Sequence, residues 1–279
     1  MEVTQMAKKT TLSLKSMKEN GEKITMITAY DYSSATLAQK AGIDTILVGD
    51  SLQMVMLGDS STIAATTDVM IHHTKAVIAG APDTFVVTDM PFGSCSSAAT
   101  AIEHATRIMK EGRCDAVKIE GGVSMAPIIR AVVDAGIPVV GHIGLTPQTT
   151  SKLGGFKVQG KGEAAGEVLA DALAVQEAGA FMIVLECVPA ELSALISQRL
   201  DVPTIGIGAG SGTDGQVLVY HDLLGLFDKF VPKFVKVYKE IGSEIAAGIG
   251  QYIAEVKSGA FPEEAHAFGG VTKEDLKDL

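Results

Sequence analysis

Short apolar runs alternate along the chain with polar or glycine-containing turns and with stretches of helical length. The apolar runs predict β-strands at residues 24–29, 45–48, 84–88, 116–119, 139–142, 181–185, 204–207 and 216–220. The stretches between them predict helices at residues 33–40, 68–79, 97–110, 123–134, 164–177 and 190–199. Glycines just before the next strand predict C-terminal helix caps at positions 42, 80, 112, 136 and 179.

This alternation predicts a parallel sheet built through right-handed crossovers. Runs such as FVVTD (85–89) and FMIVLE (181–186) are apolar on both faces, as buried parallel strands are. Eight strands in 279 residues favour a closed (β/α)8 barrel, the TIM-barrel fold, although counting does not exclude an open doubly wound sheet. We expect one domain over residues 1–279, with a polar N-terminal segment and a helical tail over 241–256. The polar end is expected to be disordered or to pack on a neighbour.

The composition excludes some classes of partner. The chain has 23 basic and 33 acidic residues and a net charge of −10, whereas sequence-independent nucleic-acid binding needs basic patches. Residues 1–23 lack the apolar core of a signal peptide, and no apolar run approaches the ~18 residues of a membrane span. Cys95, Cys114 and Cys187 are scattered without a CxxC spacing, which suits a reducing compartment. We therefore expect a soluble, cytoplasmic protein with no nucleic-acid or membrane partner.

Four acidic residues each follow or close a predicted apolar strand, namely Asp50, Asp89, Glu120 and Glu186, and His142 lies on a fifth strand. The carboxyl ends of barrel strands form one rim, where active sites of this fold lie. Carboxylates gathered there carry a desolvation cost and repel one another when ionised, and a bound cation relieves both. Oxygen ligands without Cys and with few His favour Mg2+ or Mn2+ over zinc.

Structural readings remain open beside the functional ones. Each acid taken alone could instead cap the following helix, because Asp is a good N-cap residue, and only the coincidence of four favours a metal site. Lys118 lies two residues before Glu120, so both side chains point to the same face. We expect Lys118 to hold a substrate carboxylate or a developing enolate oxygen, with a structural ion pair as the alternative.

Three further features are given no catalytic role. The G-x-G-x-x-G pattern at 210–215 is followed by QVLVYHDLL, which predicts a strand and not the helix of a dinucleotide fingerprint. We expect a Gly-rich loop at the rim that admits a bulky ligand to the backbone. The pair His72–His73 lacks metal-ligand spacing and is expected on a helix surface or at a subunit contact. Cys187 has no evident base partner, which argues against nucleophilic catalysis.

Eight motifs occur in order along the chain: ITMITAYD (24–31), ILVGDSL (46–52), VTDMPFGS (87–94), VKIEGG (117–122), GHIGLTPQ (141–148), KVQGK (157–161), LECVP (185–189) and IGIGAG (205–210). Together they strongly resemble the 3-methyl-2-oxobutanoate (ketopantoate) hydroxymethyltransferase family, over about residues 10–269. The resemblance implies a barrel of the phosphoenolpyruvate/pyruvate type, one Mg2+ ion per subunit, and a homo-oligomer, typically a homodecamer.

Motif by motif, the resemblance also implies site roles. Asp50 and Asp89 resemble direct metal ligands that lie against the bound oxo acid, and Glu120 resembles a further acid of the metal site, acting directly or through water. Ser51 and Lys118 resemble residues that hold the oxo acid.

On the same basis, Glu186 resembles the catalytic general base, and His142 resembles a residue of the substrate pocket. Two departures from the family pattern are visible. Gln53 stands where many relatives carry Gly, and GDSST (58–62) lacks the His of GHDST. Both departures lie on the loop after the second predicted strand, and neither falls on a residue to which the resemblance gives a site role.

The implied reaction is an Mg2+-dependent, aldol-type transfer of a one-carbon unit from the co-substrate 5,10-methylenetetrahydrofolate to 3-methyl-2-oxobutanoate. It gives 2-dehydropantoate, in the first step of pantothenate biosynthesis. A carboxylate with a pKa of about 4 is a weak base for a carbon acid, so Glu186 needs metal activation, an elevated pKa, or both. A lyase or mutase of the same barrel type and a non-catalytic oligomeric barrel are the alternatives.

Overall fold

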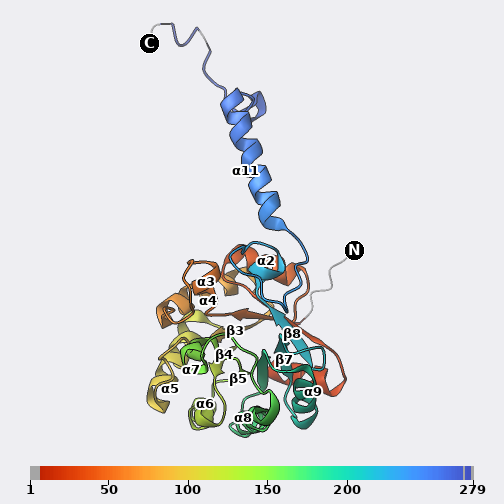
Figure 1. The fold of residues 1–279 in the computed structure, drawn as a ribbon. Helices are drawn as coiled ribbons and strands as arrows, with labels where there is room; N and C mark the ends of the chain where they lie inside the picture. Colours follow the sequence, from red (N-terminus) through yellow and green to blue (C-terminus); the bar gives the residue numbers. More distant parts are fainter. Residues whose placement is uncertain (1–6, 273, 278–279) are drawn as a thin grey trace.

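Eight parallel strands pair in chain order, and β8 pairs back with β1 to close the barrel (Figure 1). This closure confirms the (β/α)8 barrel and excludes the open sheet. The computed structural model describes residues 7–272 and 274–277. The strands are β1 (Ile24–Thr28), β2 (Thr45–Val48), β3 (Phe85–Asp89), β4 (Ala116–Glu120), β5 (Val139–Gly144), β6 (Met182–Glu186), β7 (Thr204–Ile207) and β8 (Gly215–Leu218).

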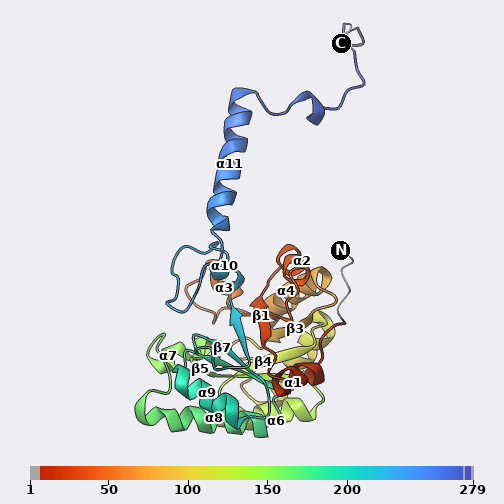
Figure 2. The same ribbon diagram turned by 90° about the vertical axis from the view of Figure 1, so that its right-hand side faces the viewer.

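Most of the helices lie around the barrel (Figures 1 and 2). The α-helices are α1 (Thr11–Glu19), α2 (Tyr32–Lys40), α3 (Leu52–Val55), α4 (Thr67–Gly80), α5 (Ala98–Arg107), α6 (Ala126–Asp134), α7 (Thr150–Leu153), α8 (Ala165–Glu177), α9 (Ala190–Arg199), α10 (Tyr220–Leu223) and α11 (Ile241–Ser258). A π-helical turn, η1 (Ile108–Gly112), continues α5, and the 3-10 turns are η2 (Val123–Met125), η3 (Pro147–Thr149), η4 (Gly162–Ala164) and η5 (Glu264–His266).

The predicted elements are present with three local corrections. The run predicted as a strand to residue 220 ends at Leu218, and Tyr220 begins α10. Gly80 and Gly112 lie inside helical turns and are not caps beyond them. A Cβ at Gly80 would lie 2.3 Å from the backbone oxygen of Tyr32, so the glycine is required for the close packing of α4 on α2.

The N-terminal segment contributes a helix that its polar composition did not predict. Thr10 and Ser13 form a reciprocal capping box that starts α1. Leu14 and Met17 of this helix are buried in the same apolar cluster as Ile24, at the start of β1, and the inward-facing side chains of the other strands. Helix α1 therefore closes the amino-terminal end of the barrel and leaves the carboxyl end free to form a site.

The chain leaves the barrel after β8. No helix separates β7 from β8, and the short α10 leads into an irregular segment at 224–240. Helix α11 then projects away from the barrel and buries none of its residues (Figures 1 and 2). It matches the helix expected at 241–256. No helix in the described part of the chain is long and apolar enough to cross a membrane.

Candidate active site

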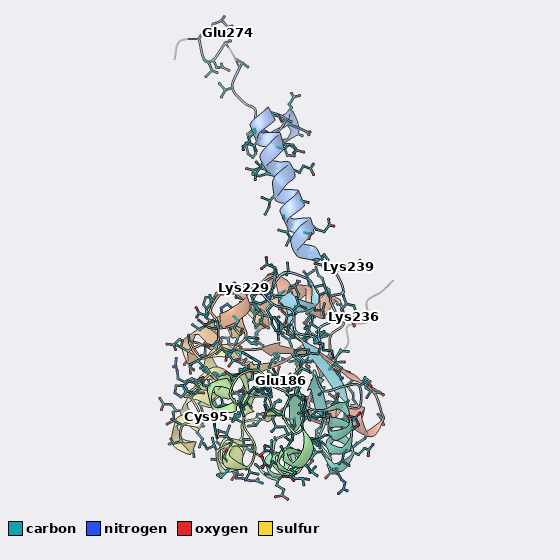
Figure 3. The ribbon with its side chains drawn as sticks, in the orientation of Figure 1. Cys95, Glu186, Lys229, Lys236, Lys239 and Glu274 are labelled. Atoms are coloured by element: carbon teal, nitrogen blue, oxygen red, sulfur yellow. The ribbon has the colours of Figure 1, made fainter. Side chains whose placement is uncertain are left out.

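All seven site residues expected from the sequence line one cavity of about 350 Å3 at the carboxyl ends of the strands: Asp50, Ser51, Asp89, Lys118, Glu120, His142 and Glu186. Leu47, Val184 and Val217 contribute apolar walls. Figure 3 shows Glu186 within the barrel and places Lys229, Lys236 and Lys239 on the segment that leads to α11. The cavity thus combines a charged floor with apolar sides.

Strand register brings the charged side chains together. Asp89 of β3 pairs with Lys118 of β4, and Glu120 of β4 pairs with His142 of β5. Because side chains alternate along a strand, Lys118 and Glu120 share a face, as their spacing predicted, and both line the cavity.

Lys118 is the central cation of the cavity. Its Nζ lies 3.2 Å from Asp89 Oδ1, 3.7 Å from Glu120 Oε1 and 2.9 Å from His142 Nδ1, and its side chain is only 4% exposed. Burial lowers the pKa of Lys118, but the carboxylates of Asp89, Glu120 and Asp50 outweigh burial and raise it. Lys118 therefore stays protonated and provides a fixed positive charge.

His142 bridges two carboxylates. Its Nδ1 lies 3.3 Å from Glu120 Oε1, and its Nε2 lies 3.1 Å from Glu186 Oε2, although this second contact is not aligned as a hydrogen bond. Burial and Lys118 lower the pKa of His142, but Glu120 and Glu186 prevail and raise it to about 9. For Glu120, burial is outweighed by His142 and Lys118, which hold its pKa below the usual range.

Asp50 and Asp89 form a pair of neighbouring buried carboxylates. The backbone N–H of Asp50 donates to Asp89 Oδ2 at 3.0 Å. Burial and then the charge of Asp89 raise the pKa of Asp50 well above its usual range. Burial also raises the pKa of Asp89, although Lys118 opposes it. Asp89 Oδ1 is buried, and it contacts Lys118 but accepts no hydrogen bond. This oxygen can therefore accept a further ligand, and a hard cation fits the pair of carboxylates.

A complete ligand set is not assembled in the structure. Among the described residues, no three His, Cys, Asp or Glu side chains form a group that could hold a metal ion. Glu120 contacts Lys118 and His142 instead of joining the two aspartates. The metal roles of Asp50, Asp89 and Glu120 therefore stay a prediction.

Gln148 is a site residue that the sequence reasoning missed. Its Nε2 donates to Asp50 Oδ2 at 2.8 Å and to Met90 O at 2.9 Å, and its backbone N–H donates to Glu120 Oε2 at 3.1 Å. It thereby fixes two of the acids from the loop after β5. Its place at the end of the GHIGLTPQ motif was the only signal for it.

Two further residues in or behind the cavity wall were also missed. Tyr30 is fully buried, and its hydroxyl lies 2.8 Å from Ser51 Oγ, which fixes the serine beside Asp50. Asp222 of α10 lines the cavity, and burial raises its pKa to about 6. Tyr30 follows β1 as Asp50 follows β2, but it carries no charge and was not considered, and Asp222 lies beyond β8 in α10.

With this geometry established, the chain can be compared with known proteins. The family model for ketopantoate hydroxymethyltransferase matches residues 8–264. The chain belongs to this family. A relative from Moorella thermoacetica, named 3-methyl-2-oxobutanoate hydroxymethyltransferase, is 57% identical over 95% of this chain and all of its own length. A relative of the same name from Heliobacterium modesticaldum is 58% identical over 95% of this chain and 97% of its own length.

Family membership makes the chain an enzyme, a hydroxymethyltransferase of the transferase class. Solved structures agree on the fold. Phosphoenolpyruvate phosphomutase from Streptomyces platensis subsp. rosaceus superposes with a TM-score of 0.62 at 17% identity, over 94% of this chain and 92% of its own. A phosphonopyruvate hydrolase in complex with oxalate and Mg++ superposes with a TM-score of 0.61 at 14% identity. The superposition covers 98% of this chain and 94% of the hydrolase chain. At these identities the likeness shows the barrel fold alone.

The two departures from the family pattern contact each other. Gln53 Nε2 donates to Asp59 Oδ2 at 2.5 Å, and the backbone N–H of Asp59 donates to Gln53 O at 3.0 Å. Gln53 is buried in α3, and its two hydrogen bonds with Asp59 join the start and the end of the loop after β2. The altered residues therefore lie on the loop beside the cavity, and their side chains form no hydrogen bond with the carboxylates of its acids.

The features left without a role behave largely as expected. His73 lies in α4, and its Nδ1 donates a hydrogen bond to Tyr30 O at 2.5 Å. This bond ties α4 to the segment after β1. Cys187 adopts a left-handed φ of 49° at the rim. Burial and then the charge of Glu186 raise the pKa of Cys187 to about 11, so its thiol stays protonated at neutral pH.

Proposed function

We propose that the cavity binds 3-methyl-2-oxobutanoate on a Mg2+ ion and adds to it a hydroxymethyl group from 5,10-methylenetetrahydrofolate, giving 2-dehydropantoate. The observation that carries this proposal is the buried pair Asp50 and Asp89, held beside Lys118 at the floor of an apolar-walled cavity. Family membership supports the substrate, because the relatives carry that substrate in their name. The metal and the folate donor rest on the resemblance and on the donor set.

Asp50 and Asp89 would hold the ion, and Glu120 would join them only after turning from Lys118 and His142, directly or through water. When bound, a Mg2+ ion acts as a Lewis acid that polarises the keto group and acidifies the neighbouring C–H. Lys118 keeps a positive charge beside the position of the keto and carboxylate oxygens, so negative charge developing there is stabilised. Ser51, fixed by Tyr30, offers a hydroxyl to the same oxygens.

We assign the role of general base to Glu186. It is the least buried of the four acids, at 15% exposure against 4% for Asp89 and Glu120. Its carboxylate lines the same cavity as Lys118, and His142 Nε2 lies 3.1 Å from Glu186 Oε2. In this role Glu186 removes the proton from C3 of the oxo acid, and His142 orients the carboxylate and stabilises its charge. The resulting carbanion forms a bond to the methylene carbon of the donor, and the two carbon–nitrogen bonds of that unit break to release tetrahydrofolate. One water supplies the hydroxyl oxygen, and the two nitrogens that are freed take up one proton from this water and one from Glu186.

Helix α11 supports the expected homo-oligomer. Its apolar residues recur on one face and are 45–56% exposed: Ile245, Ile249, Tyr252, Ile253 and Val256. A helix with such a stripe and no buried residue is stabilised when the stripe packs on a partner, and a second copy of the chain fits this need. The homodecamer itself rests on the resemblance. Ile249→Glu should lower the mass of the assembly measured by light scattering, whereas Gln251→Glu on the same helix should not.

We also propose a reducing, cytoplasmic location, because all three cysteines are free and Cys114 is buried.

The test uses the purified full chain with 3-methyl-2-oxobutanoate, 5,10-methylenetetrahydrofolate and Mg2+, with the product identified by mass spectrometry. We expect a product heavier by one hydroxymethyl group, and its loss when either the donor or the metal is withheld. Cleavage of a larger oxo acid without any folate dependence would instead identify a lyase. No product and no proton exchange from the oxo acid would identify a non-catalytic barrel.

A further inference from the structure

Asp222 lies in the same cavity as the four predicted acids, and the proposed function gives it no role. It belongs to α10, is 9% exposed and lines the cavity together with Val219, Phe227 and Phe230. Within residues 7–272 and 274–277, no group donates a hydrogen bond to its carboxylate and no cation pairs with it. A buried carboxyl group without a partner carries a desolvation cost, so its presence calls for a ligand or a chemical role.

The order of the strands places Asp222 across the barrel mouth from Lys118 and Glu120. Helix α10 follows β8, and in a closed ring of eight strands β8 lies opposite β4, which carries these two residues. Burial chiefly raises the pKa of Tyr30, and the charge of Asp222 adds to the rise, so the two side chains are neighbours. The Tyr30 hydroxyl lies 2.8 Å from Ser51 Oγ, and Asp222 therefore stands on the Ser51 side of the cavity.

The other acids of the cavity already have partners or proposed roles. Asp50 and Asp89 form the pair that is proposed to hold the ion. Glu120 lies 3.3 Å from His142 Nδ1, and Glu186 lies 3.1 Å from His142 Nε2. The acid on α10 is thus the one that remains available for a further proton transfer.

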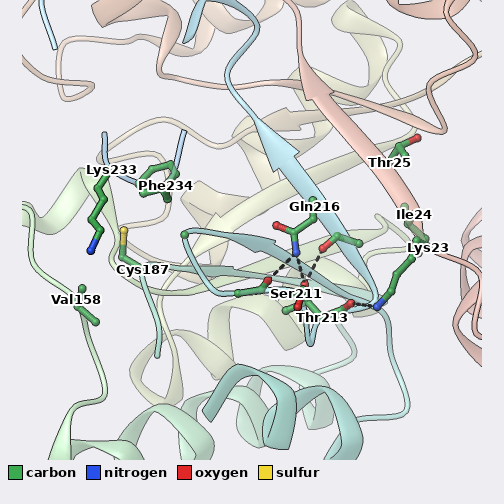
Figure 4. A pocket seen from close by; sticks show the side chains of 13 residues that line it. Lys23, Ile24, Thr25, Val158, Cys187, Ser211, Thr213, Gln216, Lys233 and Phe234 are labelled. Carbon is green, nitrogen blue, oxygen red and sulfur yellow. Dashed lines mark hydrogen bonds between the residues drawn. The ribbon is translucent and has the colours of Figure 1, made fainter. Parts of the chain in front are cut away.

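In the part of the chain that the structure describes, the wall that this cavity shares with a neighbouring pocket contributes no acid. Val158, Cys187, Lys233 and Phe234 form this shared wall (Figure 4). Burial and then the charge of Glu186 raise the pKa of Cys187 to about 11, so its thiol keeps its proton and is no base at neutral pH. A proton released from a water in the cavity therefore has no acceptor on this wall.

The proposed reaction contains a proton transfer that Glu186 does not perform. The methylene unit of the donor is bonded to two nitrogens and carries no oxygen, so the oxygen of the new hydroxyl group enters as water. Water is a weak nucleophile until a base takes its proton, and an amine nitrogen leaves slowly until an acid supplies one. A single carboxyl group that takes this proton and then gives it up meets both needs.

We propose that Asp222 is a second catalytic acid–base residue that activates the water, an inference that rests on the proposed function. The water oxygen forms a bond to the methylene carbon, one O–H bond of the water breaks, and its proton goes to the Asp222 carboxylate. A carbon–nitrogen bond of the donor breaks, the electron pair stays on the nitrogen, and this nitrogen takes the proton from Asp222. The second nitrogen takes the proton that Glu186 removed from the oxo acid.

The environment of Asp222 suits both halves of this transfer. Burial raises its pKa to about 6, near the pH at which a carboxyl group both accepts and donates a proton readily.

The test separates proton removal from the oxo acid and transfer of the one-carbon unit, in the full-length chain with Mg2+. Asp222→Asn should lower kcat for transfer from methylenetetrahydrofolate about 100-fold or more, the usual contribution of a general acid–base group. Exchange of the C3 hydrogen without donor should stay within about twofold of the wild type, because Glu186 performs that step. Formaldehyde already carries the hydroxyl oxygen, so its addition to the oxo acid should stay within about threefold.

Asp228→Asn is the matched control. It makes the same chemical change at an exposed position of the segment that follows α10, outside the residues that line the cavity. This variant should keep the wild-type rates of exchange, of formaldehyde addition and of transfer from methylenetetrahydrofolate.

Four outcomes overturn the inference or what lies beneath it. If the wild type forms product and Asp222→Asn keeps the transfer kcat within about threefold, Asp222 does not activate the water and the proposed function stands. If Asp222→Asn lowers exchange and transfer alike, the residue supports the fold or the metal site instead. If addition of formaldehyde falls as far as transfer while exchange persists, Asp222 acts on the carbon–carbon step. If the wild type forms no product from methylenetetrahydrofolate, the proposed function itself fails.

Discussion

Replacing Asp50 by Asn should change the stability of the protein in opposite directions with and without Mg2+. Asp50 is 3% exposed, and burial together with Asp89 raises its pKa well above the usual range. Without a cation, the folded state bears the cost of a buried like-charged pair. Asn keeps the shape of the side chain, can still accept from Gln148 through its amide oxygen, and removes one charge.

The size of the effect follows from the electrostatics. Two like charges roughly 5 Å apart interact by about 3 kcal/mol at an effective dielectric constant near 20. Protonation of Asp50 and the attraction of Lys118 offset part of this, which leaves about 1–2 kcal/mol. For a domain of this size that is a rise in Tm of roughly 3–6 °C for the chelated variant. With Mg2+ at about 100 times its Kd, the wild type instead gains about 2.7 kcal/mol that the variant lacks.

The pH dependence has a definite sign. A carboxyl whose pKa is raised in the folded state binds more protons there than in the unfolded chain, so stability falls as pH rises above its usual pKa. The advantage of the chelated Asp50→Asn variant should therefore grow with pH.

Thermal unfolding in chelator and in Mg2+ measures the crossover. Asp222→Asn is the matched control, because it removes a buried acid from the same cavity without touching the aspartate pair, and it should be stabilising in both conditions at neutral pH. A chelated Asp50→Asn variant that melts below the wild type, together with a wild type indifferent to Mg2+, would refute the reasoning.

Two other perturbations have expected outcomes. Gln148→Ala removes the donor to Asp50 and should weaken Mg2+ binding about 10-fold, as measured by calorimetry, with little change in global stability. Since burial raises the pKa of Asp222 to about 6, the wild type should lose stability relative to Asp222→Asn as pH rises from about 4 to 6. Urea unfolding across pH checks this, and equal curves at every pH would contradict it.

The local pattern of apolar and polar residues was enough to predict the barrel. A buried parallel strand is apolar on both faces, and a crossover helix repeats its apolar residues every three to four positions. The prediction failed where a residue is buried by residues that are distant in the sequence. The buried residues of α1, Leu14 and Met17, pack against side chains of strands far along the chain. The last strand was drawn too long because Val219 and Tyr220 continue its apolar run into α10.

The residues of the candidate site were predictable where an acidic residue stands at the carboxyl end of a predicted strand. Asp89, Glu120 and Glu186 close strands, and register alone brings Asp89 beside Lys118. Gln148 reaches Asp50 across 98 residues from a loop, and no local pattern encodes that contact. The Glu120 side chain contacts Lys118 and His142 because neighbouring strands pack against it, and the sequence alone did not predict these contacts.

The most direct measurement of the central claim is exchange of the C3 hydrogen of 3-methyl-2-oxobutanoate with solvent deuterium, followed by NMR without any folate. We expect exchange with wild type and Mg2+, none with chelator, and a rate lowered about 100-fold or more in Glu186→Gln, which should still gain stability from Mg2+. Full exchange by Glu186→Gln, or by the chelated wild type, would contradict the assignment of base and metal to this cavity.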